Sequence, residues 1–320
     1  MGRHVSAVLV TWNSAPYLRR CLEGLAHQTH RELELIAVDN ASSDDSAALV
    51  APHATRLIRN DTNRGFSAAV NQAIQVATGE FVLLVNPDCH LLPDYVERLL
   101  AAFDERTGSA TGMLIRALGH EIEPTNVIDS MGIRMTRTGR HFDANQGVPV
   151  NRQPPTANRH EVFGVSGAAG MYRMAFLRDV SIDGEPFDED FFAYREDADI
   201  AWRGRLFGWS AVCEPRAVAY HVRRVTPKVR GSLPSNVNMH SVKNRFLLRL
   251  KNQGAWLAMR NAPFELARDL IVLVAALTVE RTSLPAFTWL WRNRKRVLAK
   301  RRAIQSRRKV SDRELARWFG

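Results

Sequence analysis

A carboxylate follows directly on a segment that is predicted to be a buried strand. Asn86-Pro87-Asp88 comes just after the apolar run Phe81–Val85, which is typical of a strand covered on both faces. A side chain in that place lies at the carboxyl edge of a sheet, where open α/β folds bind ligands. Aspartate oxygens are the hard donors that Mg²⁺ or Mn²⁺ prefers when the ion also holds a diphosphate. The same three residues also suit a plain turn.

Polar residues follow three earlier apolar segments in the same way. Val5–Val10 leads to Thr11 and Asn13, Leu33–Val38 leads to Asp39 and Asn40, and Thr55–Arg59 leads to Asn60 and then to Asn63-Arg64-Gly65. Helical patterns lie between these segments, so the predicted order is βαβαβαβ, with right-handed crossovers and a mostly parallel sheet. The polar clusters then share one edge of the sheet. This convergence favours a nucleotide-type ligand over unrelated turns.

Several nucleotide and hydrolase motifs are missing from the sequence. The first turn, Thr11–Pro16, lacks the Gly-x-Gly-x-x-Gly pattern of dinucleotide oxidoreductases, and no Gly-x-x-x-x-Gly-Lys-Ser/Thr or Gly-x-Ser-x-Gly is present. These absences disfavour a dehydrogenase, a P-loop phosphotransferase and an α/β-hydrolase.

The second half of the chain contributes an acidic cluster and a histidine. Glu196, Asp197 and Asp199 open a predicted helix, where acids are expected simply because they favour the helix dipole. One of them is also a candidate general base. His221 ends the predicted strand Ala217–His221. It is either an ordinary strand residue or a metal ligand.

Taken together, these segments resemble the inverting family 2 glycosyltransferases with a GT-A fold, especially the bacterial rhamnosyltransferase-like branch. The resemblance spans about residues 5 to 250. Its pieces are 10–13, 38–44, 63–66, 86–88, 194–203, 220–221 and 243–245. Their order and spacing are specific, although each piece is weak alone. One difference is Asn86, which stands where the family has the first acid of its metal-binding Asp-x-Asp.

The resemblance implies a reaction and roles for particular residues. Asp197 aligns with the general base, Asp88 and His221 would hold Mg²⁺ or Mn²⁺, and Ser166–Gly170 would border the acceptor. Thr11, Asn13, Asp39, Gly65 and Asp88 would line the nucleotide-sugar pocket. The first candidate donor is dTDP-rhamnose, and the acceptor would be a saccharide, lipid-linked in this branch.

Two other functional classes remain open. A nucleotidyltransferase shares the fold class, but it would carry a Gly-rich, Arg-containing loop after the first strand, and Thr11–Pro16 is not one. A non-catalytic membrane or nucleic-acid adaptor would use a basic tail and would need no acids at the sheet edge.

The excess positive charge lies near the C-terminus. The chain has a formal charge of +11, and residues 281–310 hold 11 Lys/Arg and no Asp/Glu; removing these from the 44 basic residues leaves 33, equal to the 33 acidic ones. The apolar run 270–279, Trp289 and Trp291 precede the basic cluster. This order favours an anionic membrane surface, bound through 270–310, over nucleic acid. A solvated charged helix is the third interpretation.

The sequence also predicts an organisation and a location. We expect a GT-A catalytic domain over 1–255, with a nucleotide-sugar half (1–110) and an acceptor half (111–255), followed by a basic helical extension over 256–320. The run 270–279 is too short to span a bilayer, which takes about twenty residues. Three cysteines without a Cys-x-x-Cys spacing favour a reducing compartment. With no signal peptide in view, we expect a cytoplasmic protein peripheral to the inner membrane face.

Residues 119–160 are predicted to be loop-like, because Gly, Pro, Asn and Asp are frequent there. Such a segment is either a lid over the donor or a surface excursion.

Overall fold

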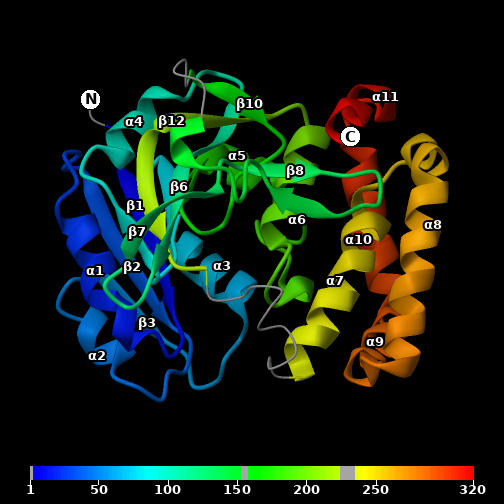
Figure 1. The fold of residues 1–320 in the computed structure, drawn as a ribbon, viewed down its shortest axis with the longest axis horizontal. Helices are drawn as coiled ribbons and strands as arrows, with labels where there is room; N and C mark the ends of the chain where they lie inside the picture. Colours follow the sequence, from blue (N-terminus) through cyan, green and yellow to red (C-terminus); the bar gives the residue numbers. More distant parts are fainter. Residues whose placement is uncertain (1–2, 153–157, 224–234) are drawn as a thin grey trace.

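The structure is a computed structural model that describes residues 3–152, 158–223 and 235–320. A twisted sheet flanked by helices forms one side of the molecule, and the C-terminal helices pack along the other (Figure 1).

The N-terminal half is a parallel sheet. Its strands are β1 (Val5–Thr11), β2 (Leu33–Asp39), β3 (Arg56–Arg59) and β4 (Phe81–Val85), in the spatial order β3-β2-β1-β4. The connecting helices are α1 (Ala15–Ala26), α2 (Ser46–Val50) and α3 (Phe66–Val76). The predicted βαβαβαβ order is confirmed. The strand order reverses between β1 and β4, which is the position where open α/β sheets bind ligands.

The second half continues the same sheet with mixed directions. Its elements are β5 (Cys89–Leu91), α4 (Tyr95–Ala101), β6 (Thr107–Leu118), β10 (His160–Val162), β11 (Gly170–Arg173), α5 (Met174–Val180), α6 (Glu196–Leu206) and β12 (Ser210–His221). Strand β11 lies antiparallel between β4 and β6, and β12 runs parallel to β6. The predicted α/β, GT-A type fold is confirmed.

Alternate residues of β4 enter two cores, one on each face of the sheet. Val82 and Leu84 pack with residues of α3, α5 and α6, whereas Leu83 and Val85 pack with residues of α1 and α4. A fully buried side chain of this size contributes about 1.5–3 kcal/mol. Helices on both faces therefore explain why β4 is apolar throughout.

The loop prediction for 119–160 is wrong over much of its length. Residues Glu123–Ser130 form β7, which pairs with β6, and Ile133–Met135 (β8) pairs with His141–Asp143 (β9). Among the strands of the described residues, β7 pairs with β6 alone, and polar residues and Pro124 are tolerated at such an edge. Residues 153–157 lie outside the described part of the chain, and the interpretation of the segment as a lid stays open.

The C-terminal helices pack on one another and on elements of the second half of the sheet domain, such as α6. They are α7 (Ser235–Asn252), α8 (Ala255–Thr278), α9 (Pro285–Arg292), α10 (Arg294–Ser306) and α11 (Asp312–Leu315). Phe319, near the end of the chain, is fully buried, and its ring lies 4.9 Å from the ring of Trp202 on α6. The division at residue 255 stays a prediction.

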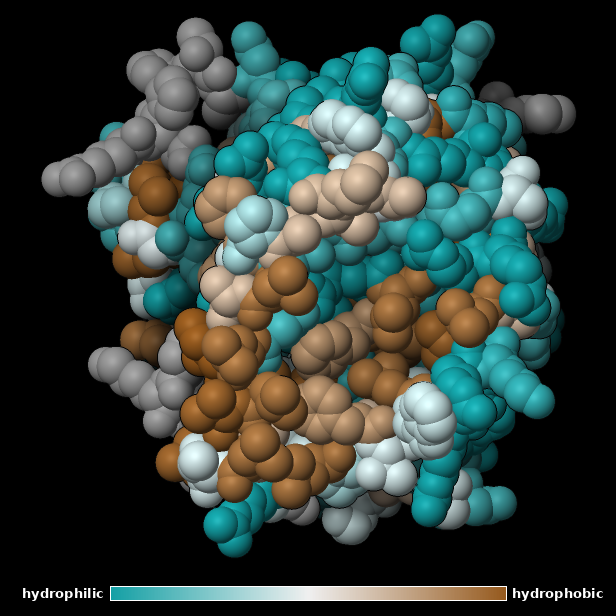
Figure 2. Space-filling view, turned by 90° about the vertical axis from the view of Figure 1, so that its right-hand side faces the viewer, coloured by the Kyte–Doolittle hydropathy of each residue, from teal (hydrophilic) through white to brown (hydrophobic). Residues whose placement is uncertain are grey.

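An apolar surface runs along α8. Leu266, Leu270, Ile271, Val274 and Leu277 are all more than half exposed, and hydrophobic side chains gather on this face of the molecule (Figure 2). Within the described residues no single helix has the length and apolar character to cross a bilayer. One bent pair, α8 with 281–292, meets that test by length and composition, and it is bent by 111° at its break.

Candidate active site

Strand pairing places His221 beside Asp88. Strand β5 runs antiparallel to β12, with Cys89 opposite His221, and the Val222 amide donates to the Asp88 carbonyl at 3.0 Å. The Nε2 atom of His221 then lies 3.5 Å from Oδ1 of Asp88, and both side chains are largely buried. Two residues that are 133 positions apart in the sequence therefore meet at the carboxyl edge of the sheet, as the resemblance implied.

Asp129 fixes the orientation of the His221 ring. Its carboxylate is fully buried and receives a hydrogen bond from Nδ1 of His221 at 2.8 Å and another from Nε of Arg223 at 2.7 Å. Burial opposes ionisation of Asp129, but these two partners hold its pKa well below the usual range. An ionised Asp129 accepts only, so Nδ1 must donate, and Nε2 is the atom that faces Asp88.

The side chains around Asp88 fit a divalent cation. Oδ1 of Asp88 is buried without a hydrogen-bond partner, and Cys89 completes a group whose candidate ligand atoms lie within 4.8 Å of one another. Burial raises the pKa of the Cys89 thiol, Sγ donates to the Ala168 carbonyl at 3.3 Å, and sulfur ligands suit softer ions than Mg²⁺ or Mn²⁺, so Cys89 is the least suited of the three residues. Asp88 and His221 remain, and adjacent ligands of an octahedral ion lie about 3 Å apart when the bonds are about 2.1 Å.

The charges around His221 also favour a cation at this position. Burial disfavours its protonation, yet Asp129 and Asp88 raise the pKa of His221 to about 9. The two carboxylates that favour a proton on the imidazole also favour a metal cation in its place.

Asp39 is held at the end of β2 by two donors. Oγ1 of Thr11 donates to Oδ1 at 2.9 Å, and the amide of Ser42 donates to Oδ2 at 3.2 Å. Asn13 is exposed, and its Oδ1 receives the amide of Ser43 at 2.8 Å. The structure thus brings Thr11, Asn13 and Asp39 together, with Asn13 shaping the loop.

Asn40 connects this cluster to Gly65. Its Nδ2 donates to Oδ1 of Asn63 and to the carbonyl of Gly65, at 2.9 and 3.2 Å. Gly65 has a φ of 85°, and a Cβ there would lie 2.6 Å from the Phe192 side chain. Only glycine combines this backbone with this close approach. Gly65 therefore lies against the loop that leads into α6.

Asp197 lies in the first turn of α6 and is half-buried. Its Oδ2 receives the amide of Gly167 at 3.3 Å. Burial and repulsion from Asp143 raise the pKa of Asp197 to about 6. Burial and Asp197 itself also raise the pKa of Glu196. Burial thus outweighs the helix N-terminus, and the carboxylate is a stronger base than an ordinary aspartate while still ionised at neutral pH.

The loop 166–170 connects Asp197 to the turn that bears Asp88. Gly167 donates to Asp197, and the carbonyl of the next residue, Ala168, receives the amide of Asn86 at 2.8 Å. The loop predicted to border the acceptor therefore contacts both Asp197 and the turn that bears Asp88.

The backbone that precedes Asp197 is strained. Phe192, Tyr194 and Arg195 have φ values of 65°, 71° and 74°, which are uncommon for residues with a side chain and recur at functional sites. Asn244 of α7 holds this loop, because its Nδ2 lies 2.8–2.9 Å from the carbonyl oxygens of Phe191, Ala193 and Tyr194.

Asp199, in the same helix turn, has a different environment. It is fully buried and is bonded by Arg203, Lys251 and Asn252 at 2.7–3.0 Å. A carboxylate with all its oxygens occupied is structural, which leaves Glu196 and Asp197 as candidate bases; of these, Asp197 is the one that contacts loop 166–170.

Sequence reasoning missed Asp129 and gave Asn244 no role. Asp129 lies in a segment predicted to be a loop, and no motif marks it. Asn244 belongs to the matching piece 243–245, which was the one available signal.

A sheet with its polar edge at the β1–β4 switch point, an Asp–His pair and a base on α6 are the features of a GT-A glycosyltransferase. The sequence model of the family Glycosyl transferase family 2 matches residues 6–178, more than half of the 320-residue chain. The chain belongs to this family and is a family 2 glycosyltransferase.

Relatives in sequence include N-acetylglucosaminyl-diphospho-decaprenol L-rhamnosyltransferase of Mycobacterium tuberculosis. It is 28% identical over 275 residues, covering 78% of this chain and 86% of the relative. The uncharacterized protein MT1568 of the same organism is 27% identical over 212 residues, and EpsH of Bacillus subtilis is 32% identical over 125. The matches span only 63% of MT1568 and 35% of EpsH.

Solved structures share the fold at low sequence identity. TarS (residues 1–349) of S. aureus has a TM-score of 0.55 at 19% identity, over 94% of this chain and 88% of that one. The mannosyltransferase PcManGT of Pyrobaculum calidifontis, in complex with GDP-Man and Mn²⁺, has a TM-score of 0.52 at 18% identity, over 96% and 84%.

Proposed function

We propose that this enzyme is an inverting, metal-dependent rhamnosyltransferase that moves rhamnose from dTDP-rhamnose to a hydroxyl of a lipid-linked saccharide. The observation that carries the proposal is the geometry around loop 166–170. Adjacent residues of this loop bond the base Asp197 and the turn that bears Asp88. A rigid connection of this kind holds a proton acceptor and a diphosphate site at a constant separation, which is what one in-line displacement requires.

The residues have distinct tasks in this reaction. Asp197 accepts the proton of the acceptor hydroxyl, whose oxygen forms a bond to the anomeric carbon as the bond to the diphosphate breaks. Asp88 and His221 would hold the cation, which supplies positive charge beside the departing diphosphate. Because one of the two is an imidazole nitrogen, Mn²⁺ fits better than Mg²⁺, which prefers oxygen ligands. Thr11, Asp39 and the Gly65 loop would hold the nucleoside.

The sugar and the acceptor follow from the relative with the longest of the matches described above, whereas the dTDP carrier follows from the family resemblance. Its name specifies an L-rhamnosyl group and a diphospho-decaprenol acceptor, and 86% of its length aligns with this chain. We carry both over as proposals.

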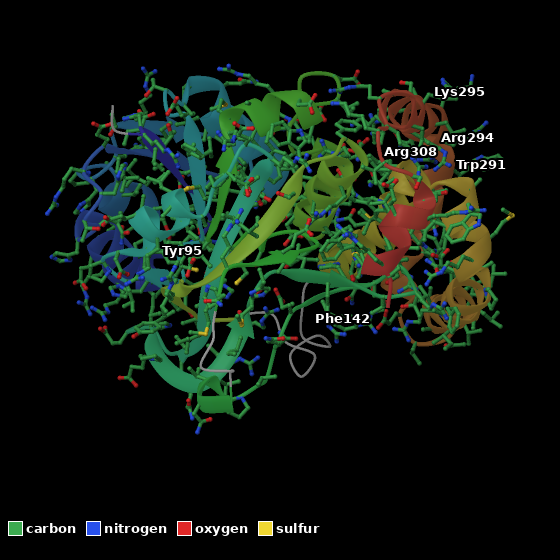
Figure 3. All side chains as sticks on the ribbon, turned by 90° about the horizontal axis from the view of Figure 1, so that it is seen from above. Tyr95, Phe142, Trp291, Arg294, Lys295 and Arg308 are labelled. Atoms are coloured by element: carbon green, nitrogen blue, oxygen red, sulfur yellow. The ribbon has the colours of Figure 1, made fainter. Side chains whose placement is uncertain are left out.

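We further propose that the protein works as a peripheral protein on the cytoplasmic face of the membrane. The support is the exposed apolar surface of α8 together with Trp291, which is 68% exposed. Trp291, Arg294 and Lys295 lie together on the outer side of the helical extension (Figure 3). Apolar and tryptophan side chains beside basic ones suit an anionic bilayer surface. Nucleic acid is not an expected partner.

The test is transfer from labelled dTDP-rhamnose, UDP-sugars and GDP-sugars to a polyprenyl-diphosphate saccharide, with and without Mn²⁺. The proposal predicts Mn²⁺-dependent transfer from dTDP-rhamnose, with inversion at the anomeric carbon. Transfer from a UDP- or GDP-sugar alone would reject the donor, and a rate unaffected by chelator would reject the metal. A nucleotidyltransferase would instead form a nucleotide sugar from a sugar phosphate.

A further inference from the structure

A small basic cavity lies between α7, α8 and the residues that lead into α6. Its volume is about 120 Å³, well below the roughly 300 Å³ or more of pockets that hold drug-sized ligands. The charged residues of its lining are Arg140, Arg195, Arg245, Arg268 and Glu280. Four guanidinium groups face one carboxylate, so the cavity favours a compact anion.

One of these arginines lacks a hydrogen-bond partner for a buried atom. Nε of Arg268 is buried and unpaired, and leaving such a donor unsatisfied costs stability. The neighbouring Arg245 is different, because its Nε pairs with Asp269 at 3.2 Å. Arg268 is thus the side chain whose donor a ligand would satisfy.

The cavity lies next to the catalytic loop. Arg195, one of its lining residues, is the N-cap of α6, and Asp197 follows in the first turn of that helix. A ligand group bound in the cavity therefore lies beside the chain segment that carries the base.

Part of the cavity lining is apolar and continues onto the outer surface. Ile271, Val272 and Ala275 of α8 line it. Ile271 is also 57% exposed and belongs to the hydrophobic patch of α8 (Figure 2). A basic site that suits an anion thus lies directly beside an apolar strip on the surface of α8.

We propose that this cavity binds the diphosphate of an isoprenoid-diphosphate acceptor, with the isoprenoid chain lying along α8. The inference rests on the proposed function and adds a recognition site for the acceptor. Planar guanidinium groups bind phosphate oxygens through paired hydrogen bonds, and the apolar strip provides the complement to the lipid. The first sugar of the acceptor, attached to that diphosphate, then lies nearest to Asp197.

The test compares Arg268→Ala, Arg268→Lys and the control Arg31→Ala, in which an exposed arginine that precedes β2 is removed. Each is assayed with a saccharide on polyprenyl diphosphate and with the same saccharide on an uncharged alkyl chain. Arg268→Ala should raise KM for the diphosphate acceptor about 10- to 100-fold, the range for a hydrogen bond to a charged group. KM for the donor and for the alkyl acceptor should not change, Arg268→Lys should recover part of the loss, and Arg31→Ala should resemble the wild type.

A binding measurement separates the lipid headgroup from free phosphate. A short prenyl diphosphate, the corresponding prenyl alcohol and inorganic pyrophosphate are titrated in the presence of chelator, so that no metal-held diphosphate contributes. The proposal predicts that prenyl diphosphate binds more tightly than either of the others, and that Arg268→Ala weakens this binding at least tenfold. Equal binding by wild type and Arg268→Ala would overturn it.

The outcomes also distinguish this inference from the function on which it rests. If wild type transfers sugar equally well to the diphosphate and alkyl acceptors, and Arg268→Ala changes neither, the cavity inference fails while the glycosyltransferase proposal stands. If wild type uses no lipid-linked acceptor at all, the proposed acceptor and this inference both fail.

Discussion

His221 and Asp129 form a hydrogen-bonded pair, with Nδ1 of the imidazole 2.8 Å from a fully buried carboxylate oxygen. The pair turns Nε2 toward Asp88. An Asp–His arrangement of this kind orients a metal-binding imidazole and increases its basicity. Asp129 lies on β7 and His221 on β12, strands that both pair with β6, so the sheet itself keeps the ligand in place.

Asp129→Asn is expected to weaken metal affinity without removing a ligand. The amide can no longer accept as a full anion, so the ring of His221 loses its fixed orientation. Changes at such positions typically cost 10- to 100-fold in metal affinity or activity. Titrating the transfer rate with Mn²⁺ should show a higher half-saturating concentration. A Mn²⁺ curve identical to that of the wild type would remove His221 from the metal site.

Substitutions of Lys300 and Lys295, which both lie on α10, should have different effects on stability. Lys300 is buried and lies 2.6 Å from Oδ1 of Asp188, whereas Lys295 is exposed. Lys300→Met leaves buried Asp188 with one fewer cation, and breaking a buried pair costs about 3–5 kcal/mol. We expect a lower denaturation midpoint and weaker transfer to lipid-linked and soluble acceptors alike.

Lys295→Met is the matched control and should leave stability unchanged while slightly reducing sedimentation with anionic liposomes. Salt should weaken that liposome binding, because exposed charges are screened over about 10 Å at 0.1 M. If Lys300→Met is as stable as Lys295→Met, the ion pair between Lys300 and Asp188 does not stabilise the fold.

Gly65→Ala should damage the donor site more than Gly147→Ala does. Both glycines have positive φ, 85° and 82°, so the two positions are matched in this backbone angle. A Cβ at Gly65 would meet Phe192 at 2.6 Å, whereas a Cβ at Gly147 would have nothing within 4 Å. We expect Gly65→Ala alone to raise KM for the donor, measured at saturating acceptor. Equal effects of the two changes would show that strain, and not the contact with Phe192, is responsible.

The raised pKa of Asp197 has consequences for rate and for stability. Because the base must be ionised, kcat/KM should fall about tenfold per pH unit below about 6. The folded state holds this proton more tightly than the unfolded chain, so stability is lost as pH rises from about 4 to 6. At pH 7.5, Asp197→Asn should therefore be more stable than the wild type by about 1–3 kcal/mol, and at pH 4 the two should agree. A variant that is less stable at pH 7.5 would contradict the raised pKa.

The sequence was sufficient for the parts of the site that depend on local pattern. Short apolar segments followed by polar residues predicted β1 to β4 and their common edge, because strand burial and turn chemistry are local properties. The acids that open α6 were recognisable for the same reason.

Pairings between distant segments were not predictable in this way. Asp129 meets His221 only because two strands add to β6, and the polar sequence of β7 resembles a loop when its neighbour is unknown. Likewise, basic residues of α10 looked like a uniform membrane-binding cluster. Lys300 is instead buried against Asp188; its spacing from Val297 and Ile304 puts it on the buried face of α10, a signal that a count of basic residues does not use.

The most direct test of the account is the single-turnover rate of Asp197→Asn with saturating donor, Mn²⁺ and acceptor. Removing the proton acceptor while keeping the shape should slow transfer about 10²- to 10⁴-fold, and donor affinity, measured by binding, should stay within twofold or so of the wild type. Glu196→Gln, which changes the adjacent carboxylate, should retain most of the rate. Near-normal transfer by Asp197→Asn would contradict the account and assign the base to another residue.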